Sequence, residues 1–437
     1  MDLFDKCVRF TDAKEVMAAG LYPYFTQIDS AQDPEVIIKG KKMIMIGSND
    51  YLGLTTHPKL KEAAIKAVKK YGTGCTGSRF LNGTFKIHIE VEEKLAEFEQ
   101  KEAALLFTTG VLTNLGTIAG LVGRDDVVIT DKLDHASIID GCRLSFGETR
   151  RFRHNNIDDL KRVLHSIDKN KGKLIVVDGI FSMEGDIARL PEIVELSRKY
   201  NARLMVDDAH SIGVLGKGGR GTAEYFNIQN EVDIVMGTCS KSLASIGGFI
   251  TADADVIHYL KHNSRALIFS ASPPPSAVAS ISAAIDIIRE EPERREKLWE
   301  NTRKMKKELT ELGFDTGVSE TPIIPIIVGD DLRAFQMRRL LFDEGVFTNP
   351  VVSPATPKGR ALIRTSYMAT HTEEQLDRVL EAFENVGKKL GVISGRVVPK
   401  GRKVPIRYRW LRKGIKMRKK IKQKVITLMD RVYRYYH

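Results

Sequence analysis

One lysine in the sequence lies among small and hydroxyl-bearing residues, where it could do chemistry. Lys241 follows a short apolar run, and Thr238, Ser240, Gly247 and Gly248 are its neighbours in sequence. The hydroxyl groups could bind an anion, and the paired glycines would let the backbone pass close to a ligand. Burial lowers the pKa of a lysine, which is what Schiff-base chemistry requires. An ordinary loop lysine is the alternative interpretation.

A pair of carboxylates at the end of another apolar run is the second candidate. Asp207 and Asp208 follow the run Leu204–Val206 and precede His210. Ligands of open α/β sheets bind outside the carboxyl ends of the strands, so Asp207 could pair with a protonated heterocyclic nitrogen, such as that of pyridoxal phosphate. Alternatively, Asp207 caps a turn and His210 belongs to the core. We predict no metal site, because the further ligands that a metal needs are missing around this pair.

The elements that must position these residues alternate between short β-branched runs and amphipathic stretches. From about residue 45 to 285 this alternation is typical of βαβ units and predicts an α/β fold with a mostly parallel sheet. The predicted strands are residues 43–46, 104–107, 127–130, 174–177, 203–206 and 234–236, and predicted helices include 60–70, 157–167 and 190–200. Residues 46–285 would form the large domain, after an N-terminal segment of residues 1–45.

A smaller α+β domain is predicted for residues 286–395. Its expected elements are a charged helix, a strand, a helix, a strand and a last helix, at residues 290–312, 323–327, 332–344, 361–366 and 373–390. Residues 396–437 form a separate tail.

The charge of the chain is concentrated in that tail. The 437 residues contain 68 Lys plus Arg against 56 Asp plus Glu, a net charge of +12, yet residues 396–437 alone hold 16 of the basic residues and one acid, Asp430. The remaining body has a net charge of −3, which excludes a nucleic-acid binder with a basic surface spread over the whole protein. The start of the chain lacks a secretory signal, so we expect a cytoplasmic location with reduced thiols.

Several ordered motifs together resemble the α-oxoamine synthases, a branch of the fold-type I pyridoxal-phosphate enzymes. The resemblance runs from about Leu21 to His371. It is carried by Asp134-His135-Ala136-Ser137, Phe181-Ser182-Met183-Glu184-Gly185-Asp186, Asp207-Asp208-Ala209-His210 and Gly237-Thr238-Cys239-Ser240-Lys241. Members of this family condense an amino acid with an acyl-CoA and release carbon dioxide. The resemblance therefore implies a transferase with pyridoxal 5'-phosphate as its cofactor.

The resemblance also implies roles for individual residues. Lys241 would bind the cofactor as a Schiff base and move protons at Cα, Asp207 would pair with the pyridinium nitrogen, and His135 would stack on the ring. His210 and Ser182 would lie near the phenolic oxygen. The implied phosphate ligands are Gly110, Val111 and Thr238, with Ser270 reaching the phosphate of a neighbouring subunit, and the implied substrate ligands are Asn49, Arg364 and Thr356. The family pattern has departures here, because Val352 stands where some members have an arginine and Val111 where an aromatic residue is common.

Residues 71–84, 210–213 and 241–248 most resemble the members that use L-serine and palmitoyl-CoA, in their soluble bacterial form. This implies a decarboxylating Claisen condensation to 3-ketosphinganine, CoA and CO2, the first step of sphingolipid synthesis. Glycine, alanine and serine differ by one small group, so 2-amino-3-ketobutyrate CoA ligase and the 5-aminolevulinate and 8-amino-7-oxononanoate synthases remain alternatives. A cofactor-free scaffold subunit of the same fold is the non-enzymatic alternative. The family also implies a homodimer with shared active sites.

The tail has the pattern of a basic amphipathic helix. Apolar residues recur at three, four or six spacing between Lys and Arg, at Leu411, Ile415, Ile421, Val425, Leu428, Val432 and Tyr436. This pattern is typical of an anchor on an anionic membrane surface, which here would be the inner face of the cytoplasmic membrane. A solvated basic tail and a nucleic-acid-binding tail are the alternatives.

Overall fold

A seven-stranded sheet forms the centre of the large domain in the computed structural model, which describes residues 2–353 and 355–394. The strand order is β3-β9-β8-β7-β6-β4-β5, and β9 alone runs antiparallel to its neighbours. The strands are β3 (Ala103–Phe107), β4 (Asp126–Asp131), β5 (Glu148–Phe152), β6 (Gly172–Asp178), β7 (Arg203–Asp207), β8 (Ile234–Thr238) and β9 (Gly248–Ala252). The predicted α/β class with a mostly parallel sheet is therefore confirmed.

Helices cover both faces of this sheet, because its central strands are apolar on both sides. Along β6, Val176 faces a core that includes side chains of α5, α6 and α10, whereas Ile175 and Val177 face a core with α7 and α8. A third core packs α4 and α12 against β3 and β9. The helices of this domain are α3 (Pro58–Tyr71), α4 (Lys86–Glu99), α5 (Gly110–Leu121), α6 (Ala136–Leu144), α7 (Ile157–His165), α8 (Leu190–Lys199), α9 (Thr222–Tyr225), α10 (Ala254–Asn263), α11 (Arg265–Ile268) and α12 (Pro275–Glu290), with a 3-10 turn at Gln229–Glu231.

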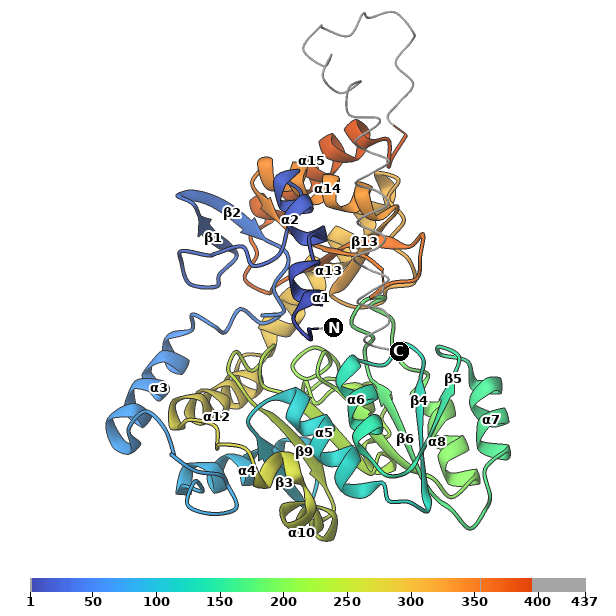
Figure 1. Ribbon diagram of the computed structural model, residues 1–437. Helices are drawn as coiled ribbons and strands as arrows, with labels where there is room; N and C mark the ends of the chain where they lie inside the picture. The colour runs from blue at the N-terminus through green and yellow to red at the C-terminus, as the bar shows by residue number, and fades with distance from the viewer. Residues whose placement is uncertain (1, 354, 395–437) are drawn as a thin grey trace, which may run out of the picture.

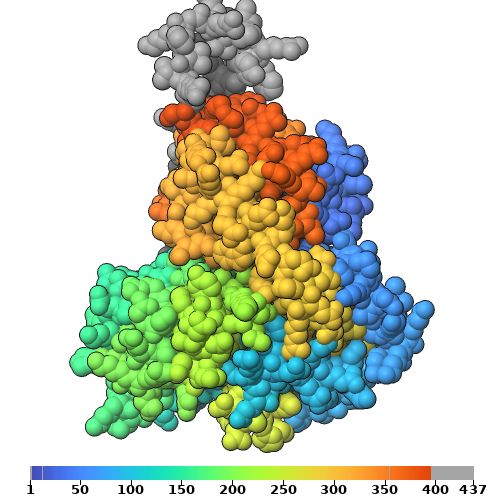
Figure 2. Space-filling view, turned by 180° about the vertical axis from the view of Figure 1, so that it is seen from behind, coloured from blue at the N-terminus to red at the C-terminus, as the bar shows by residue number. Residues whose placement is uncertain are grey.

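The smaller domain lies above the large one in Figure 1 and forms the orange and red lobe in Figure 2. Its antiparallel sheet has the order β10-β13-β12 and packs against α13, α14 and α15. The helices and strands of this part of the chain are α13 (Pro292–Glu311), β10 (Ile323–Gly329), α14 (Asp331–Asp343), β11 (Val346–Phe347), β12 (Asn349–Val351), β13 (Ala361–Ser366) and α15 (Glu373–Leu390). The three helices and two strands predicted for this region are confirmed within about two residues.

The N-terminal segment packs with the smaller domain. It contains α1 (Asp5–Val8), α2 (Asp12–Ala18), β1 (Glu35–Ile38) and β2 (Lys41–Met45). Val16 and Ile44 belong to the same hydrophobic core as α13 to α15, and β2 pairs with β11 in a small separate sheet. The run at residues 43–46 is thus a strand, but the prediction that it joins the βαβ sheet is wrong.

The expected boundary between the two domains, at residue 286, lies inside helix α12. The predicted tail of residues 396–437 lies outside the described residues. Within residues 2–353 and 355–394, no helix is long and apolar enough to cross a membrane.

Candidate active site

A cavity of about 320 Å³ opens at the edge of the central sheet where the parallel strands end. The carboxyl-terminal residues of β6, β7 and β8, Asp178, Asp207 and Thr238, all line it. This is the edge at which open α/β sheets bind their ligands. The cavity brings together eight of the predicted site residues: Gly110, Val111, His135, Ser182, Asp207, His210, Thr238 and Lys241.

Asp207 lies at the base of this cavity and is held by two hydrogen bonds. The side-chain amide of Asn114 donates to Asp207 Oδ2 at 2.7 Å, and the backbone N–H of Ala209 donates to Oδ1 at 3.0 Å. Asp207 is only 3% exposed. A buried carboxylate that two donors hold in a fixed orientation is suited to pair with a protonated ring nitrogen.

His135 immediately precedes α6, and its backbone is anchored to the last residue of β6. Its N–H donates to Asp178 Oδ2 at 2.9 Å, while its Nδ1 is 2.7 Å from Ser137 Oγ. Burial lowers the pKa of His135, so the ring is neutral at pH 7 and can lie against an aromatic ligand. Asp178 on β6 pairs in register with Asp207 on β7. Burial, and to a smaller extent the charge of Asp207, raises the pKa of Asp178 well above the usual range.

Lys241 lies in the loop between β8 and β9 with its amine in the cavity. Burial lowers its pKa to about 7, with the Arg364 guanidinium acting in the same direction and the carboxylates of Asp207 and Asp178 opposing it. A large fraction of the amine is therefore neutral at pH 7. A neutral amine can attack an aldehyde, which is what the sequence predicted for this residue.

A cradle for an anion adjoins the lysine. Helix α5 begins at Gly110, so its first backbone N–H groups point into the cavity beside the hydroxyls of Thr238 and Ser240. A Cβ at position 110 would lie 2.8 Å from Thr238 Oγ1, so only glycine lets the helix approach this closely. Free N–H groups at a helix N-terminus with adjacent hydroxyls form a site for a phosphate.

The predicted substrate residues are placed differently. Arg364, on β13, is buried, and its Nε donates to the backbone oxygen of Ser182 at 2.7 Å, which brings the smaller domain to the cavity rim. Asn49 lies close by, with its Oδ1 3.5 Å from the hydroxyl of Tyr51. Thr356 is buried in a separate pocket with Glu184 and does not line the cavity.

Ser270 also lies away from the cavity lining. It is half-buried in the loop after α11, and its hydroxyl contacts only the backbone oxygen of Ala271 among the described residues. Ser270 therefore provides no ligand to the cavity of its own chain.

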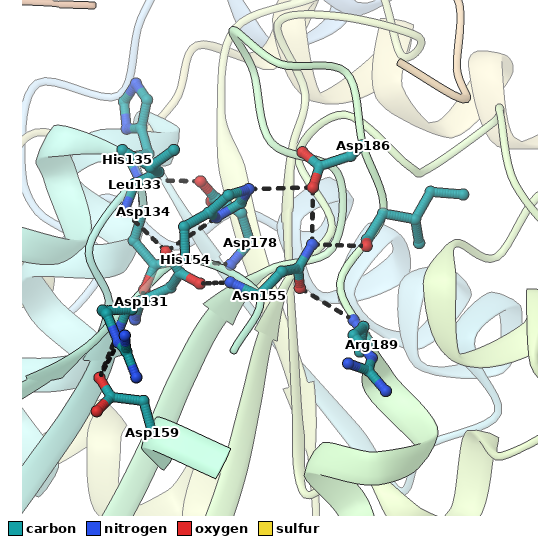
Figure 3. A network of polar contacts seen from close by, with 12 residues as sticks. Asp131, Leu133, Asp134, His135, His154, Asn155, Asp159, Asp178, Asp186 and Arg189 are labelled. Carbon is teal, nitrogen blue, oxygen red and sulfur yellow. Dashed lines mark hydrogen bonds and ion pairs between the residues drawn. The ribbon is translucent and has the colours of Figure 1, made fainter. Parts of the chain in front are cut away.

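A network of polar contacts surrounds His154, next to the cavity residues His135 and Asp178 (Figure 3). His154 Nδ1 is 3.1 Å from Asp131 Oδ1, and its Nε2 is 3.0 Å from Asp186 Oδ2. Burial opposes a charge on this ring, yet the two carboxylates raise the pKa of His154 to about 10, so it is an imidazolium at pH 7. The Asp131–His154–Asp186 bridge thereby ties the loop before His135 to the loop that carries Ser182.

Sequence reasoning missed several of these partners, including Asn114, Asp178, Ser137 and Tyr51. Asn114 is 93 residues from Asp207 and lies within α5, where nothing in the local pattern distinguishes it from a solvated polar residue. Asp178 ends a predicted strand beside β7, so its place at the sheet edge was the one available signal. Among the described residues, no group of three or more His, Cys, Asp or Glu could hold a metal ion.

Fold and site together define a class of enzyme with a partly buried lysine, an acid at a strand end and an anion cradle. Residues 41–383 match the model of the family described as aminotransferase class I and II. The match covers most of the chain, so the chain belongs to this family.

Particular relatives narrow the class. The chain is 53% identical over 392 residues to a serine palmitoyltransferase from Sphingobacterium spiritivorum, covering 90% of this chain and 98% of that one. An 8-amino-7-oxononanoate synthase from Thermoanaerobacter pseudethanolicus is 48% identical over 381 residues, covering 87% and 96%. The solved serine palmitoyltransferase of S. paucimobilis with a bound PLP-myriocin aldimine has a TM-score of 0.87 and 37% identity, covering 90% of this chain and 100% of that one. The predicted family and the fold-type I pyridoxal-phosphate fold are confirmed.

The residues of the cavity fit pyridoxal phosphate. Lys241 offers an amine to its aldehyde, Asp207 a carboxylate to its ring nitrogen, and the start of α5 an anion site to its phosphate. In addition, Asn114 Oδ1 and Ser242 Oγ are buried without a hydrogen-bond partner among the described residues, so this region has unused polar capacity.

Proposed function

We propose that this chain is a pyridoxal-phosphate-dependent acyltransferase that condenses L-serine with a long-chain acyl-CoA, palmitoyl-CoA above all. The products would be 3-ketosphinganine, CoA and CO2. The observation that carries the proposal is the convergence of Lys241, Asp207 and the α5 cradle in one cavity, in a chain 53% identical to a serine palmitoyltransferase. A cofactor-free scaffold subunit would have no use for this combination.

The cofactor supplies an electron sink for negative charge at Cα of the amino acid. Asp207, oriented by Asn114, keeps the ring nitrogen protonated. Lys241 takes the proton from Cα and later returns one, for which a pKa of about 7 is suitable. Arg364, held by the backbone of Ser182, binds the carboxylate of the amino acid, because its planar guanidinium matches that group.

The direct test is a substrate panel with the purified protein loaded with pyridoxal phosphate. L-serine, glycine and L-alanine are each combined with acetyl-, pimeloyl- and palmitoyl-CoA, and the release of free CoA is measured. We expect serine with palmitoyl-CoA to give the highest kcat/KM, and Lys241→Ala to lower it about a thousandfold. A preference for alanine with pimeloyl-CoA, or for glycine with acetyl-CoA, would instead assign the chain to one of the sister synthases.

The site is completed by a second copy of the chain in this proposal. Apolar side chains are exposed near the cavity mouth. Val111 and Ile246 belong to the cavity lining, and Phe269, the neighbour of Ser270 in sequence, is 74% exposed. Thr108, next to the cradle, donates a hydrogen bond to the backbone of Ala271, which fixes the Phe269–Ala271 loop close to the phosphate site. A homodimer would bury this surface and bring Ser270 to the partner's phosphate.

The basic tail is proposed to hold a cytoplasmic enzyme on the inner face of the cytoplasmic membrane. The support comes from the sequence, in which residues 396–437 combine 16 basic residues with a periodic apolar stripe. An acyl-CoA substrate and a lipid product fit an enzyme located at such a surface.

A further inference from the structure

We propose that Tyr51 is a positioning residue that holds His210 in the tautomer with its proton on Nε2. The Tyr51 hydroxyl lies 2.7 Å from His210 Nδ1. The tyrosine is 1% exposed, and its hydroxyl is otherwise 3.5 Å from Asn49 Oδ1. The inference rests on the proposed function of the same cavity and assigns a role there to a residue for which the sequence analysis predicted none.

His210 is a neutral imidazole in this environment. Burial lowers its pKa well below the usual range, and the positive charges of Lys241 and Arg364 act in the same direction. A neutral ring has one N–H and one acceptor nitrogen, so the hydrogen bond with Tyr51 decides which is which.

The surroundings of Tyr51 determine the direction of that bond. Burial raises the pKa of the Tyr51 phenol, so it keeps its proton, and the neighbouring Arg364 guanidinium acts against that shift. A guanidinium can only donate, so the phenol oxygen accepts from the side of Arg364 and its single proton is available for a nitrogen or oxygen acceptor. His210 Nδ1 at 2.7 Å is a better acceptor position than Asn49 Oδ1 at 3.5 Å.

The consequence lies at the other ring nitrogen. When Nδ1 accepts from Tyr51, Nε2 carries the hydrogen and has no partner among the described residues, while the ring lines the cavity. His210 is then a hydrogen-bond donor to an anionic oxygen, as the phenolic oxygen of the cofactor would be. The opposite tautomer would present a lone pair to that oxygen and repel it.

The test reads the tautomer directly, in full-length protein labelled with ¹⁵N-histidine, before and after loading with pyridoxal phosphate. Long-range ¹H–¹⁵N spectra distinguish protonated from unprotonated ring nitrogens, and the His210 signal is assigned by its absence in His210→Gln. We expect Nδ1 unprotonated and Nε2 protonated in both states. A protonated Nδ1 in the unmodified chain overturns the proposal even if no Tyr51 variant folds.

A variant then tests whether Tyr51 is the cause. Tyr51→Phe removes only the hydroxyl, and we expect a mixture of tautomers before loading and a dissociation constant for pyridoxal phosphate about fivefold higher, as for one lost hydrogen bond. Tyr367→Phe is the matched control, because its hydroxyl is also buried but has no hydrogen-bond partner among the residues that the structure describes, and it does not line the cavity. Equal affinity in Tyr51→Phe and the unmodified chain, or an equal loss in Tyr367→Phe, contradicts the proposal. Neither readout involves serine or an acyl-CoA, so a wrong substrate assignment leaves both interpretable.

Discussion

At the scale of single residues, the chemistry depends on how burial and neighbouring charges set protonation. Lys241 and Asp207 could be predicted from the sequence, because each follows an apolar run that ends at one edge of a parallel sheet. Their partners could not, since Asn114 and Tyr51 come from elements far away in the chain. Local patterns reveal which residues end strands, but which distant polar side chains meet them is decided by packing.

The lowered pKa of Lys241 predicts how cofactor uptake depends on pH. Only the neutral amine attacks an aldehyde, so with a pKa of about 7 the initial rate of pyridoxal-phosphate incorporation should rise about tenfold from pH 6 to pH 8 and then level off. Stopped-flow absorbance of the cofactor-free protein measures this rate, with Lys241→Ala as the blank. A rate that keeps rising tenfold per unit through pH 9 would mean an ordinary lysine.

At the scale of elements, each helix and strand predicted from the sequence for residues 43–390 is present in the structure, and three strands that were missed or misplaced have physical reasons. Strand β5 was missed because it is an edge strand whose exposed residues are charged, as edge strands often are. Strand β9 was missed because it follows the glycines of the Lys241 loop. Strand β2 was placed in the wrong sheet, since an apolar run does not reveal its pairing partner, and β11 lies about 300 residues later.

The His154 bridge between two loops predicts a pH-dependent stability. The folded-state pKa of about 10 lies above the ordinary value near 6.5, so the bridge stabilises fully below about pH 6.5 and loses its contribution as pH rises toward 10. Removing the imidazolium leaves the buried Asp131 unpaired on that side. We expect His154→Gln to cost about 2 kcal/mol at pH 6.5, or an unfolding temperature lower by about 3 °C.

Thermal unfolding at pH 6.5, 8 and 10 measures this difference. The difference in unfolding temperature between the unmodified protein and His154→Gln should shrink steadily toward pH 10. His165 is an exposed residue on α7, and His165→Gln should leave the unfolding temperature unchanged at each pH. A gap that stays constant over this range would show that His154 acts by packing and not by its charge.

At the scale of the whole molecule, a near-neutral catalytic body is joined to a strongly basic tail. The body of 395 residues has a net charge of −3, and residues 396–437 carry +15. We therefore expect membrane binding to depend on the tail and catalysis to depend on the body, so that the two can be tested separately.

Deleting residues 396–437 should abolish sedimentation with anionic vesicles of phosphatidylserine and phosphatidylcholine. Activity on palmitoyl-CoA in detergent should stay within about twofold of the full chain, because the cavity residues that the structure describes all lie between residues 109 and 247. Vesicles of phosphatidylcholine alone are the control, and full-length protein should bind them weakly, since binding rests partly on charge. Unchanged sedimentation of the truncated protein would show that residues 396–437 are not the segment that binds the membrane.

Homodimerisation is tested on the same preparations. The loaded enzyme should elute as a dimer, and Phe269→Asp should weaken association because it places a charge on an exposed apolar surface. A monomer with full activity would contradict the shared active site.

The reaction itself is tested most directly by following the carbon atoms of serine. L-serine labelled with ¹³C either at the carboxyl carbon or at Cα is incubated with palmitoyl-CoA and the loaded enzyme, and the lipid product is analysed by mass spectrometry. We predict a 3-ketosphinganine that keeps the Cα label and lacks the carboxyl label. A product that retains the carboxyl carbon, or no lipid product from serine while glycine or alanine reacts, would contradict the proposed decarboxylating condensation.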